Sequence, residues 1–233
     1  MAPPPAEPAA ADPRIASILR PWVGRFIVFE GPDGSGKSTQ FRRLTDAINA
    51  SGIALTTVRE PGGTVTGEAI RQVLLDRANT GMSLRCEMLL YMASRAELVE
   101  STIMPSLRAG KLVLADRFVS STLAYQGAAG GLPLADIGAV ARVATGGLLP
   151  DLIVLFDVDT QTASQRMGRS LDRMEAKGVP FHTKVRQGYL DQAKADPGHF
   201  AVVDARASED QVWASLLDTL TQRRPTGPAQ RVM

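Results

Sequence analysis

A glycine-rich stretch that contains a lysine and a serine is the clearest chemical feature of the sequence. It reads EGPDGSGKST over residues 30–39 and matches the pattern G-x-x-x-x-G-K-S. Glycines let the backbone curl so that successive N–H groups face one anion, while Lys37 can reach the outer phosphates of a nucleotide and the Ser38 hydroxyl can hold Mg²⁺. The stretch predicts a nucleoside triphosphate site; a glycine-rich turn that binds nothing is the alternative. The predicted nucleotide-binding residues are Gly31, Pro32, Asp33, Gly34, Ser35, Gly36, Lys37, Ser38 and Thr39.

Asp116 and Arg117 form a second chemical feature, because an apolar run ends at them. A carboxylate at the end of such a run suits the metal environment of a phosphate-binding enzyme, and a guanidinium fork suits a phosphate or a neighbouring carboxylate. A salt bridge at the end of a strand, or a helix cap, is the simpler alternative.

The elements that must position these residues alternate between strands and helices. Apolar runs predict strands at residues 26–30, 53–58, 111–115, 151–157 and 200–203. Helical spacing predicts helices at residues 37–50, 67–75, 84–108 with a break near Pro105, 134–145, from 160 onward, 181–194 and 208–220. The alternation predicts an α/β fold with a parallel sheet covered by helices on both faces. Ligands of such sheets bind at the carboxyl ends of the strands, so segments 31–38, 59–63 and 116–126 should meet at one edge.

The charge balance and the cysteine content argue against several classes of protein. The chain of 233 residues carries 26 Lys and Arg against 24 Asp and Glu, which gives no electrostatic case for binding nucleic acid or a membrane. The single cysteine, Cys86, excludes an intrachain disulfide and suits a reducing compartment, so we expect a cytoplasmic protein.

The length of the chain predicts one sizeable domain. Residues 1–24 are rich in Ala and Pro and predict a flexible extension without function, in which residues 15–19 could form one short turn that docks. This start has neither the basic region nor the long apolar core of a signal peptide. Residues 25–222 form the predicted domain, and residues 223–233 a flexible tail.

Four motifs, in order and at matching intervals, resemble those of thymidylate kinases. They are EGPDGSGKS at residues 30–38, REPGGT at 59–64, DR at 116–117 with STLAYQG at 121–127, and LDRME at 171–175. The likeness covers about residues 25–222 and looks like the bacterial branch of the family. It implies a P-loop nucleoside monophosphate kinase fold with a five-stranded parallel sheet, and transfer of the γ-phosphoryl group of ATP to dTMP with Mg²⁺. It also implies a role in dTTP biosynthesis and a homodimer, to which the long helix from Leu84 could contribute an interface.

The resemblance also implies roles for single residues. Lys37 and the loop amides would hold the ATP phosphates, and Ser38 and Asp116 would belong to the metal environment. Asp33 matches a carboxylate that contacts the 3′-hydroxyl of the acceptor sugar, and an Asx-turn is its alternative. The predicted acceptor-binding residues are Asp33, Glu60, Arg71, Tyr91, Arg95, Arg117, Ser121, Thr122, Tyr125 and Gln126.

Within this set, Arg71 and Arg117 match arginines directed at the acceptor phosphate. Tyr91 and Arg95 are four residues apart on one helix face, and the resemblance implies that the ring stacks on a pyrimidine while the guanidinium donates to thymine O4. A core tyrosine and a surface arginine are the simpler alternative. Tyr125 matches a tyrosine that occupies the space of a 2′-hydroxyl.

Residues 166–178 form the predicted lid. The phosphate loop has no arginine, and in this family an arginine comes either from that loop or from the lid, so the lid is expected to supply one. Arg169 and Arg173 are therefore predicted to be catalytic together with Lys37 and Asp33, whereas Arg166 is expected to pack against adenine. A solvated helix face is the alternative for this basic run.

The sequence departs from the family pattern at Phe118, where Tyr or His is usual, and the lid is slightly short before Leu171. A kinase of another nucleoside monophosphate or deoxynucleoside on the same fold is the nearest alternative function. A nucleotide switch of the GTPase type is a more distant one, because the chain has no Asn-Lys-x-Asp segment.

Overall fold

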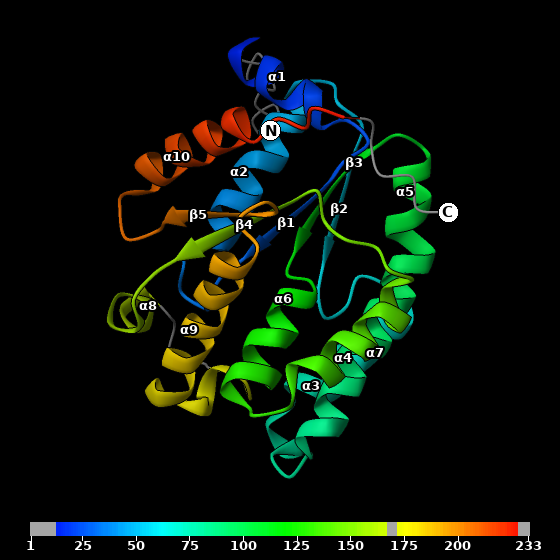
Figure 1. The fold of residues 1–233 in the computed structure, drawn as a ribbon, viewed down its shortest axis with the longest axis vertical. Helices are drawn as coiled ribbons and strands as arrows, with labels where there is room; N and C mark the ends of the chain where they lie inside the picture. Colours follow the sequence, from blue (N-terminus) through cyan, green and yellow to red (C-terminus); the bar gives the residue numbers. More distant parts are fainter. Residues whose placement is uncertain (1–12, 167–171, 228–233) are drawn as a thin grey trace, which may run out of the picture.

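Five parallel strands form the centre of the fold in the computed structural model, which describes residues 13–166 and 172–227 (Figure 1). Their order across the sheet is β2-β3-β1-β4-β5, as expected for strands joined by helical crossovers. The strands are β1 (Phe26–Glu30), β2 (Leu55–Arg59), β3 (Leu112–Asp116), β4 (Leu152–Asp157) and β5 (Phe200–Asp204).

Helices cover both faces of the sheet, as the alternation of apolar runs predicts (Figure 1). They are α1 (Pro13–Leu19), α2 (Lys37–Ala50), α3 (Val65–Leu75), α4 (Leu84–Leu98), α5 (Met104–Arg108), α6 (Val119–Thr122), α7 (Leu134–Thr145), α8 (Thr160–Arg166), α9 (Val179–Ala195) and α10 (Glu209–Gln222). Short 3₁₀ turns occur at Arg20–Trp22, Arg77–Asn79 and Glu175–Lys177. Across the described ranges, none of the helices combines the length and the apolar character needed to cross a lipid bilayer.

The side chains of β1 divide between two cores because successive residues of a strand point to opposite faces. Ile27 and Phe29 pack with α2 and α10 on one face, while Phe26 and Val28 pack with α4 and α9 on the other. Glu30 continues the second series, so its carboxylate is directed to the face that α6 and α9 cover.

Strand register brings the carboxyl ends of three strands together. Phe29 of β1 lies opposite Asp116 of β3, and Asp116 lies opposite Arg59 of β2. The segments that follow these strands therefore begin at neighbouring points of one sheet edge, as the sequence predicts.

The helix predicted at residues 84–108 is interrupted just before Pro105, as expected, but by a π turn rather than by an end of the helix. A π-helical turn at Val99–Ile103 separates α4 from α5, and Pro105 lies in the first turn of α5. Proline lacks an N–H donor and crowds the carbonyl four residues earlier, and a π turn just before it accommodates both effects. A second π turn, Leu123–Ala129, follows α6.

Residues 13–24 are not a flexible extension, so that prediction is corrected for this part of the chain. Residues 13–22 form α1 and a 3₁₀ turn, and the side chain of Trp22 is only 1% exposed. Its indole Nε1 donates a hydrogen bond of 3.1 Å to the carbonyl of Leu220 at the end of α10. Ile15 and Ile18 pack against the same core, which confirms the expected docking of a short turn near residues 15–19.

The predicted flexible tail is also corrected for its first residues. The guanidinium of Arg223 donates to the carbonyls of Pro197 at 2.9 Å and Phe200 at 3.0 Å. Arg25 donates to the carbonyl of Gly227. These contacts hold the chain after α10 against the ends of β1 and β5.

Removing the indole of Trp22 should destabilise the protein. Trp22→Ala deletes a fully buried ring and its hydrogen bond, so the free energy of unfolding should fall by about 3–5 kcal/mol in urea denaturation. Ser17→Ala, on the exposed side of α1, is the control and should change it by less than about 0.5 kcal/mol. Equal stability of Trp22→Ala and the wild type would show that the docked segment does not contribute.

Candidate active site

The phosphate loop lies between β1 and α2, where three glycines permit the turn. Gly34 has φ of +77°, a backbone conformation that side-chain-bearing residues rarely adopt. A Cβ atom there would lie 2.4 Å from the carbonyl oxygen of Ala163 in α8, so glycine is required for packing as well. Lys37 is the first residue of α2, and the positive end of the helix therefore faces the loop.

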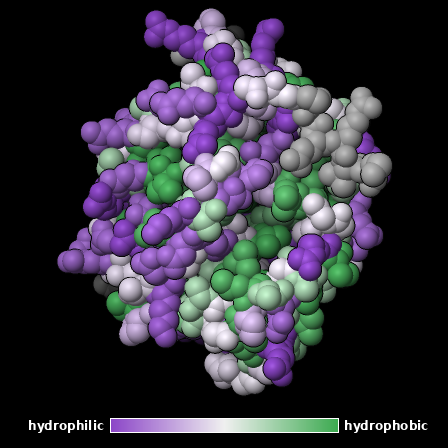
Figure 2. All heavy atoms as spheres, in the orientation of Figure 1, coloured by the Kyte–Doolittle hydropathy of each residue, from purple (hydrophilic) through white to green (hydrophobic). Residues whose placement is uncertain are grey.

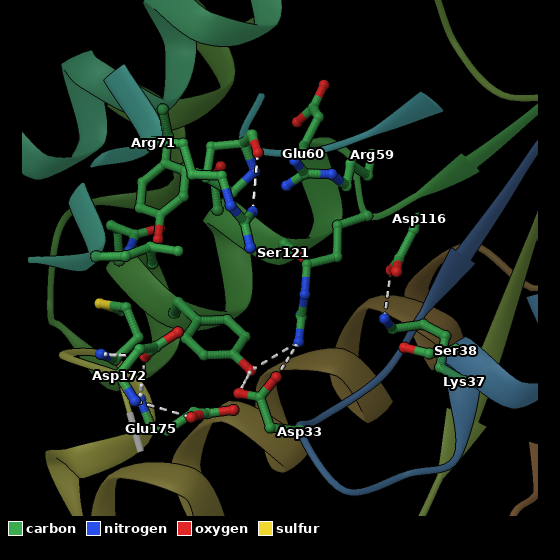
Figure 3. A pocket seen from close by; sticks show the side chains of 18 residues that line it. Asp33, Lys37, Ser38, Arg59, Glu60, Arg71, Asp116, Ser121, Asp172 and Glu175 are labelled. Atoms are coloured by element: carbon green, nitrogen blue, oxygen red, sulfur yellow. Dashed lines mark hydrogen bonds and ion pairs between the residues drawn. The ribbon is translucent and has the colours of Figure 1, made fainter. Parts of the chain in front are cut away.

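A cavity of about 220 Å³ opens beside this loop at the carboxyl edge of the sheet (Figure 3). Segments 31–38, 59–63 and 116–126 all contribute to it, as the sequence predicts. The residues that line it are Asp33, Lys37, Ser38, Arg59, Glu60, Pro61, Arg71, Leu75, Tyr91, Asp116, Arg117, Ser121, Thr122, Tyr125, Gln126, Asp172, Met174 and Glu175.

Lys37 and Asp116 form an ion pair at the mouth of the phosphate loop (Figure 3). The Lys37 ammonium donates to Oδ1 of Asp116, and the hydroxyl of Ser38 faces the same cavity. Within the described parts of the chain, no three His, Cys, Asp or Glu side chains cluster as a complete metal site.

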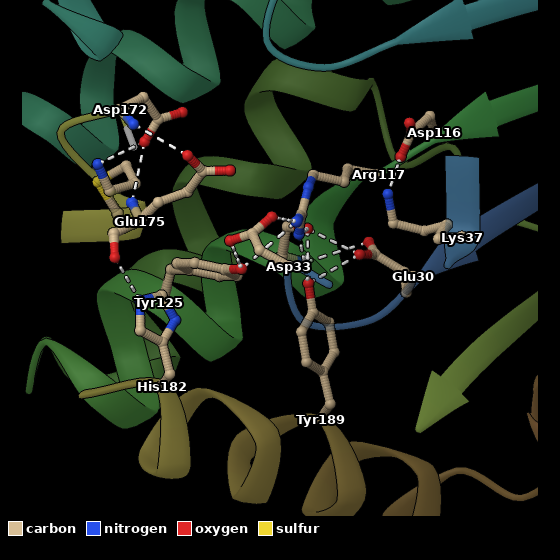
Figure 4. A network of polar contacts seen from close by, with 12 residues as sticks. Glu30, Asp33, Lys37, Asp116, Arg117, Tyr125, Asp172, Glu175, His182 and Tyr189 are labelled. Atoms are coloured by element: carbon tan, nitrogen blue, oxygen red, sulfur yellow. Dashed lines mark hydrogen bonds and ion pairs between the residues drawn. The ribbon is translucent and has the colours of Figure 1, made fainter. Parts of the chain in front are cut away.

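Arg117 joins the end of β3 to the phosphate loop (Figure 4). Its φ of +72° is unusual for a non-glycine residue and turns the chain sharply after the strand. Its Nη2 lies 2.5 Å from Oδ1 of Asp33, and the Tyr125 hydroxyl donates to Oδ2 of Asp33 at 2.8 Å. Burial raises the pKa of Asp33, but Arg117 and the Tyr125 hydrogen bond outweigh it and hold the pKa below its usual value. Asp33 is therefore a carboxylate with fixed orientation.

The buried carboxylate of Glu30 holds the residues around Arg117 in place by hydrogen bonds, although the sequence analysis gave it no role. It accepts hydrogen bonds from the amide of Phe118 at 2.8 Å, the hydroxyl of Ser121 at 2.7 Å and the hydroxyl of Tyr189 at 2.9 Å (Figure 4). Burial raises its pKa, with Arg117 acting in the opposite direction. Ser121 lines the cavity, but its hydroxyl is bonded to protein groups, so its observed role is to hold Arg117.

Three of the residues predicted to contact the base line the cavity, namely Tyr91, Thr122 and Gln126. Arg95 is not among the lining residues, and its contact with thymine O4 stays a prediction. Its guanidinium is 1% exposed and donates to Glu60, to the Thr122 hydroxyl at 3.1 Å and to the Phe118 carbonyl at 3.0 Å. Arg95 reaches the cavity only through Thr122, because the buried carboxylate of Glu60 attracts its charge.

Phe118, where the family usually has Tyr or His, is a packing residue. Its ring lies edge-on to Phe26 with centroids 5.1 Å apart, and the Arg95 guanidinium lies 5.4 Å from its centroid. An apolar ring at this position completes the core under β1 without needing a hydrogen-bond partner.

Two further arginines face the cavity from the edge that β2 and α3 form. Arg71 was predicted, and it lines the cavity while donating to the carbonyl of Pro61 at 2.9 Å. Arg59 was not predicted, and it is paired with Glu68 at 2.9 Å. Burial and the charge of Arg59 lower the pKa of Arg71. Together with Arg117 and Lys37, these groups give the cavity the positive charge that an anionic ligand needs.

The predicted lid arginines occupy different places. Arg166 ends α8 and donates to the carbonyls of Ala205 at 2.7 Å and Arg206 at 3.3 Å. With Ser35, Gly36, Thr39 and Ser208, among others, it lines a second cavity of about 290 Å³ on the other side of the phosphate loop. This position agrees with a contact to the base of a nucleotide held by the loop. Arg169, with Gly168 and Leu171, lies outside the described residues.

Arg173 is held by buried partners in this structure, and its catalytic role stays a prediction. Its side chain is buried, with Nε donating to the carbonyl of Leu74 at 2.7 Å and Nη1 to Glu87 at 2.6 Å. Arg173 does not line the cavity because the buried Glu87 carboxylate on α4 holds its guanidinium away from the phosphate loop.

The residues around Arg173 do reach the cavity, and sequence reasoning missed them. Asp172 Oδ1 accepts the amides of Met174 at 2.7 Å and Glu175 at 2.9 Å, while the Glu175 carboxylate accepts the amide of Asp172 at 2.9 Å. This reciprocal capping could have been found from the spacing D-x-x-E in the motif LDRME.

Comparison with known proteins gives consistent results. A family model described as thymidylate kinase matches residues 29–216. The thymidylate kinase of Symbiobacterium thermophilum is 45% identical over 210 residues, covering 88% of this chain and 98% of its own. That of Deinococcus radiodurans is 46% identical over 202 residues, covering 86% and 98%. The crystal structure of thymidylate kinase from Ehrlichia chaffeensis superposes with a TM-score of 0.70 at 30% identity, covering 84% of this chain and 98% of that one.

The pH dependence of the free energy of unfolding should show that burial raises the pKa of Glu60. Burial raises the pKa of Glu60 to about 7, although Arg95 acts against the rise, and its Oε1 has no hydrogen-bond partner among the described residues. The folded-state pKa lies above the ordinary value of 4.5, so the stabilisation is complete below pH 4.5 and is lost as the pH rises towards 7.

Glu60→Gln removes this loss because glutamine does not ionise. Relative to wild type, the variant should therefore gain roughly 2 to 3 kcal/mol of unfolding free energy between pH 5 and pH 8, whatever its offset at pH 5. Urea denaturation at both pH values measures the difference, with the exposed substitution Glu97→Gln as the control for removing one charge. The absence of any gain would show that Glu60 is already ionised in the folded protein at pH 5.

Proposed function

The chain belongs to the thymidylate kinase family, and from that premise we propose that it transfers the γ-phosphoryl group of ATP to dTMP, releasing ADP and dTDP for dTTP biosynthesis. One observation carries the proposal beyond family membership. A lysine at the start of α2 and three guanidiniums, from Arg59, Arg71 and Arg117, face a single cavity at the carboxyl edge of the sheet. Such a cavity can hold two phosphate-bearing ligands close together, which phosphoryl transfer requires.

The donor nucleotide would bind across the phosphate loop. The loop amides, Lys37 and the N-terminus of α2 would hold the phosphates, and the second cavity with Arg166 would take the adenine. Ser38 and Asp116 would hold Mg²⁺, since a hydroxyl and a carboxylate are the hard oxygen ligands that this ion prefers. The ion would supply positive charge to the phosphate oxygens.

The acceptor nucleotide would occupy the first cavity. Arg71 and Arg117 would bind its phosphate. The oriented carboxylate of Asp33 would accept a hydrogen bond from the 3′-hydroxyl of its sugar. Tyr91 would stack on the base beside Thr122 and Gln126, while Tyr125 would fill the space of a 2′-hydroxyl. Because Asp33, Arg117 and Tyr125 are bonded to one another before any ligand arrives, the sugar and phosphate would meet groups that need no rearrangement.

Catalysis in this scheme is electrostatic, because charge in phosphoryl transfer is spread over the equatorial oxygens. Lys37 would offset the charge near the phosphate loop. Arg169 would act on the transferred group from the lid, and Arg173, which is paired with Glu87 in this structure, is the second candidate.

We further propose a cytoplasmic homodimer. Its support is apolar surface on α4 and α7, where Leu89 is 52% exposed, Leu134 is 54% exposed and Val143 is 84% exposed. Hydrophobic patches lie between hydrophilic residues over the lower half of the face shown in Figure 2. Light scattering on the purified protein tests the dimer, and a monomer at micromolar concentration would exclude it.

The acceptor panel tests the proposed reaction. With ATP and Mg²⁺, turnover measured for dTMP, dUMP, dCMP, dGMP and AMP should be highest for dTMP, because the cavity places Tyr91, Thr122 and Gln126 together for a pyrimidine base. Preference for another nucleotide would assign the chain to a different kinase on this fold.

Replacing the phosphate-loop lysine should abolish most of the activity. Lys37→Ala removes the ammonium positioned at the phosphates, so kcat should fall by about 10²–10³-fold while the circular dichroism spectrum and Tm stay close to wild type. Arg42→Ala removes an exposed cation from the same helix and should retain the wild-type rate. A near-normal rate for Lys37→Ala would remove this residue from the mechanism.

The two remaining lid arginines should give different phenotypes. Arg169→Ala should lower kcat by at least about tenfold with little change in dTMP affinity, since its charge would act on the transition state. Arg173→Ala should instead lower the free energy of unfolding by about 3–5 kcal/mol, because it leaves the Glu87 carboxylate buried with a weaker partner. Full stability of Arg173→Ala with a large loss of kcat would restore Arg173 as the catalytic arginine.

A further inference from the structure

Glu87 on α4 is a buried carboxylate to which the proposed mechanism gives no role. Its side chain is only 2% exposed, yet three polar groups converge on it. Gln126 Nε2 donates to its Oε1 at 2.8 Å, Arg173 Nη1 donates to its Oε2 at 2.6 Å, and Lys177 Nζ lies 3.4 Å from both oxygens. Glu87 therefore joins the C-terminal part of the predicted lid to a residue that lines the acceptor cavity.

The contact with Gln126 determines which end of that carboxamide faces Glu87. A carboxylate can only accept hydrogen bonds, so the NH₂ group of Gln126 must point to it. The other end, Oε1, receives no hydrogen bond from any described residue, and Gln126 lines the cavity beside Tyr91 and Thr122. The oxygen is therefore left as an acceptor for a ligand in the cavity.

The orientation holds only while Glu87 is ionised, and its surroundings favour that state. Burial raises the pKa of Glu87, but the hydrogen bonds from Gln126 and Arg173 and the charge of Lys177 outweigh it and keep the pKa below its usual value. The two cations of the segment 172–177 thus maintain the polarity of Gln126 indirectly.

We propose that Glu87 is a positioning residue that fixes the Gln126 carboxamide with its oxygen towards the acceptor base, so that the site selects a base with an N–H donor at N3. The inference rests on the proposed function and deepens it. Thymine carries a hydrogen at N3, whereas the N3 of cytosine is an acceptor. Two acceptors facing each other in a desolvated site weaken binding by about tenfold to a hundredfold.

The test compares two ligands that share the sugar, the phosphate and the 5-methyl group, namely dTMP and 5-methyl-dCMP. Glu87→Gln is close in size to the wild-type residue but can donate as well as accept, so it frees Gln126 to turn. The ratio of the two dissociation constants, measured by calorimetry, should fall at least tenfold in this variant, while the KM for ATP stays within about twofold of wild type. An unchanged ratio in a folded Glu87→Gln protein overturns the inference.

Two further variants distinguish an effect on the orientation of the Gln126 carboxamide from a general loss of stability. Met88→Ala truncates a buried side chain of α4 that packs against α7 and should lower Tm without changing the ratio. The double variant E87Q/Q126E exchanges the amide and the carboxylate and restores an acceptor in the cavity, so the ratio should return to within about threefold of wild type. Should E87Q fail to fold, this double variant decides, and a ratio that stays low in it overturns the inference. Wild-type protein that does not bind dTMP would instead refute the proposed function.

Discussion

Parallel pairing of β1 with β3 is the constraint on which the site depends. It sets Phe29 opposite Asp116, so the phosphate loop and Arg117 leave the sheet at adjacent points. The two ion pairs at the site, Lys37 with Asp116 and Arg117 with Asp33, each join a residue after β1 to one at the end of β3. A crossover that inserted another strand between β1 and β3 would separate the charges that the two ligands need to share.

Buried carboxylates hold this site in shape. Glu30 receives the amide and hydroxyl groups that fix the chain around Arg117, Glu60 holds Arg95, and Glu87 holds Arg173. Each is nearly inaccessible to solvent; Glu60 itself lines the cavity, whereas Glu30 and Glu87 act on it through neighbours. Glu30 fixes the chain around Arg117, which faces the cavity, whereas Glu60 and Glu87 hold the buried guanidiniums of Arg95 and Arg173.

Glu60 and Glu87 show that burial alone does not decide ionisation. Burial raises the pKa of both, but Glu87 has hydrogen bonds from Gln126 and Arg173 and the charge of Lys177, whereas Glu60 has one charged partner and an oxygen without one. The pKa of Glu60 therefore rises to about 7 and that of Glu87 falls. In these two residues the neighbouring donors and charges decide the direction of the pKa shift, because both carboxylates are buried.

The amino-acid sequence by itself determined the strands, the parallel α/β class and the edge at which the functional segments meet, because apolar runs and glycine patterns depend on neighbours along the chain. The phosphate-loop pattern also identified Lys37, whereas Asp33, Arg71 and Arg117 were assigned from the family resemblance. The tertiary structure alone decided which guanidiniums face the cavity. The sequence predicts that Arg95 and Arg173 contact ligands. In the structure, each forms an ion pair with a carboxylate that lies tens of residues away along the chain. Partners of that kind are chosen by packing, which no local pattern encodes.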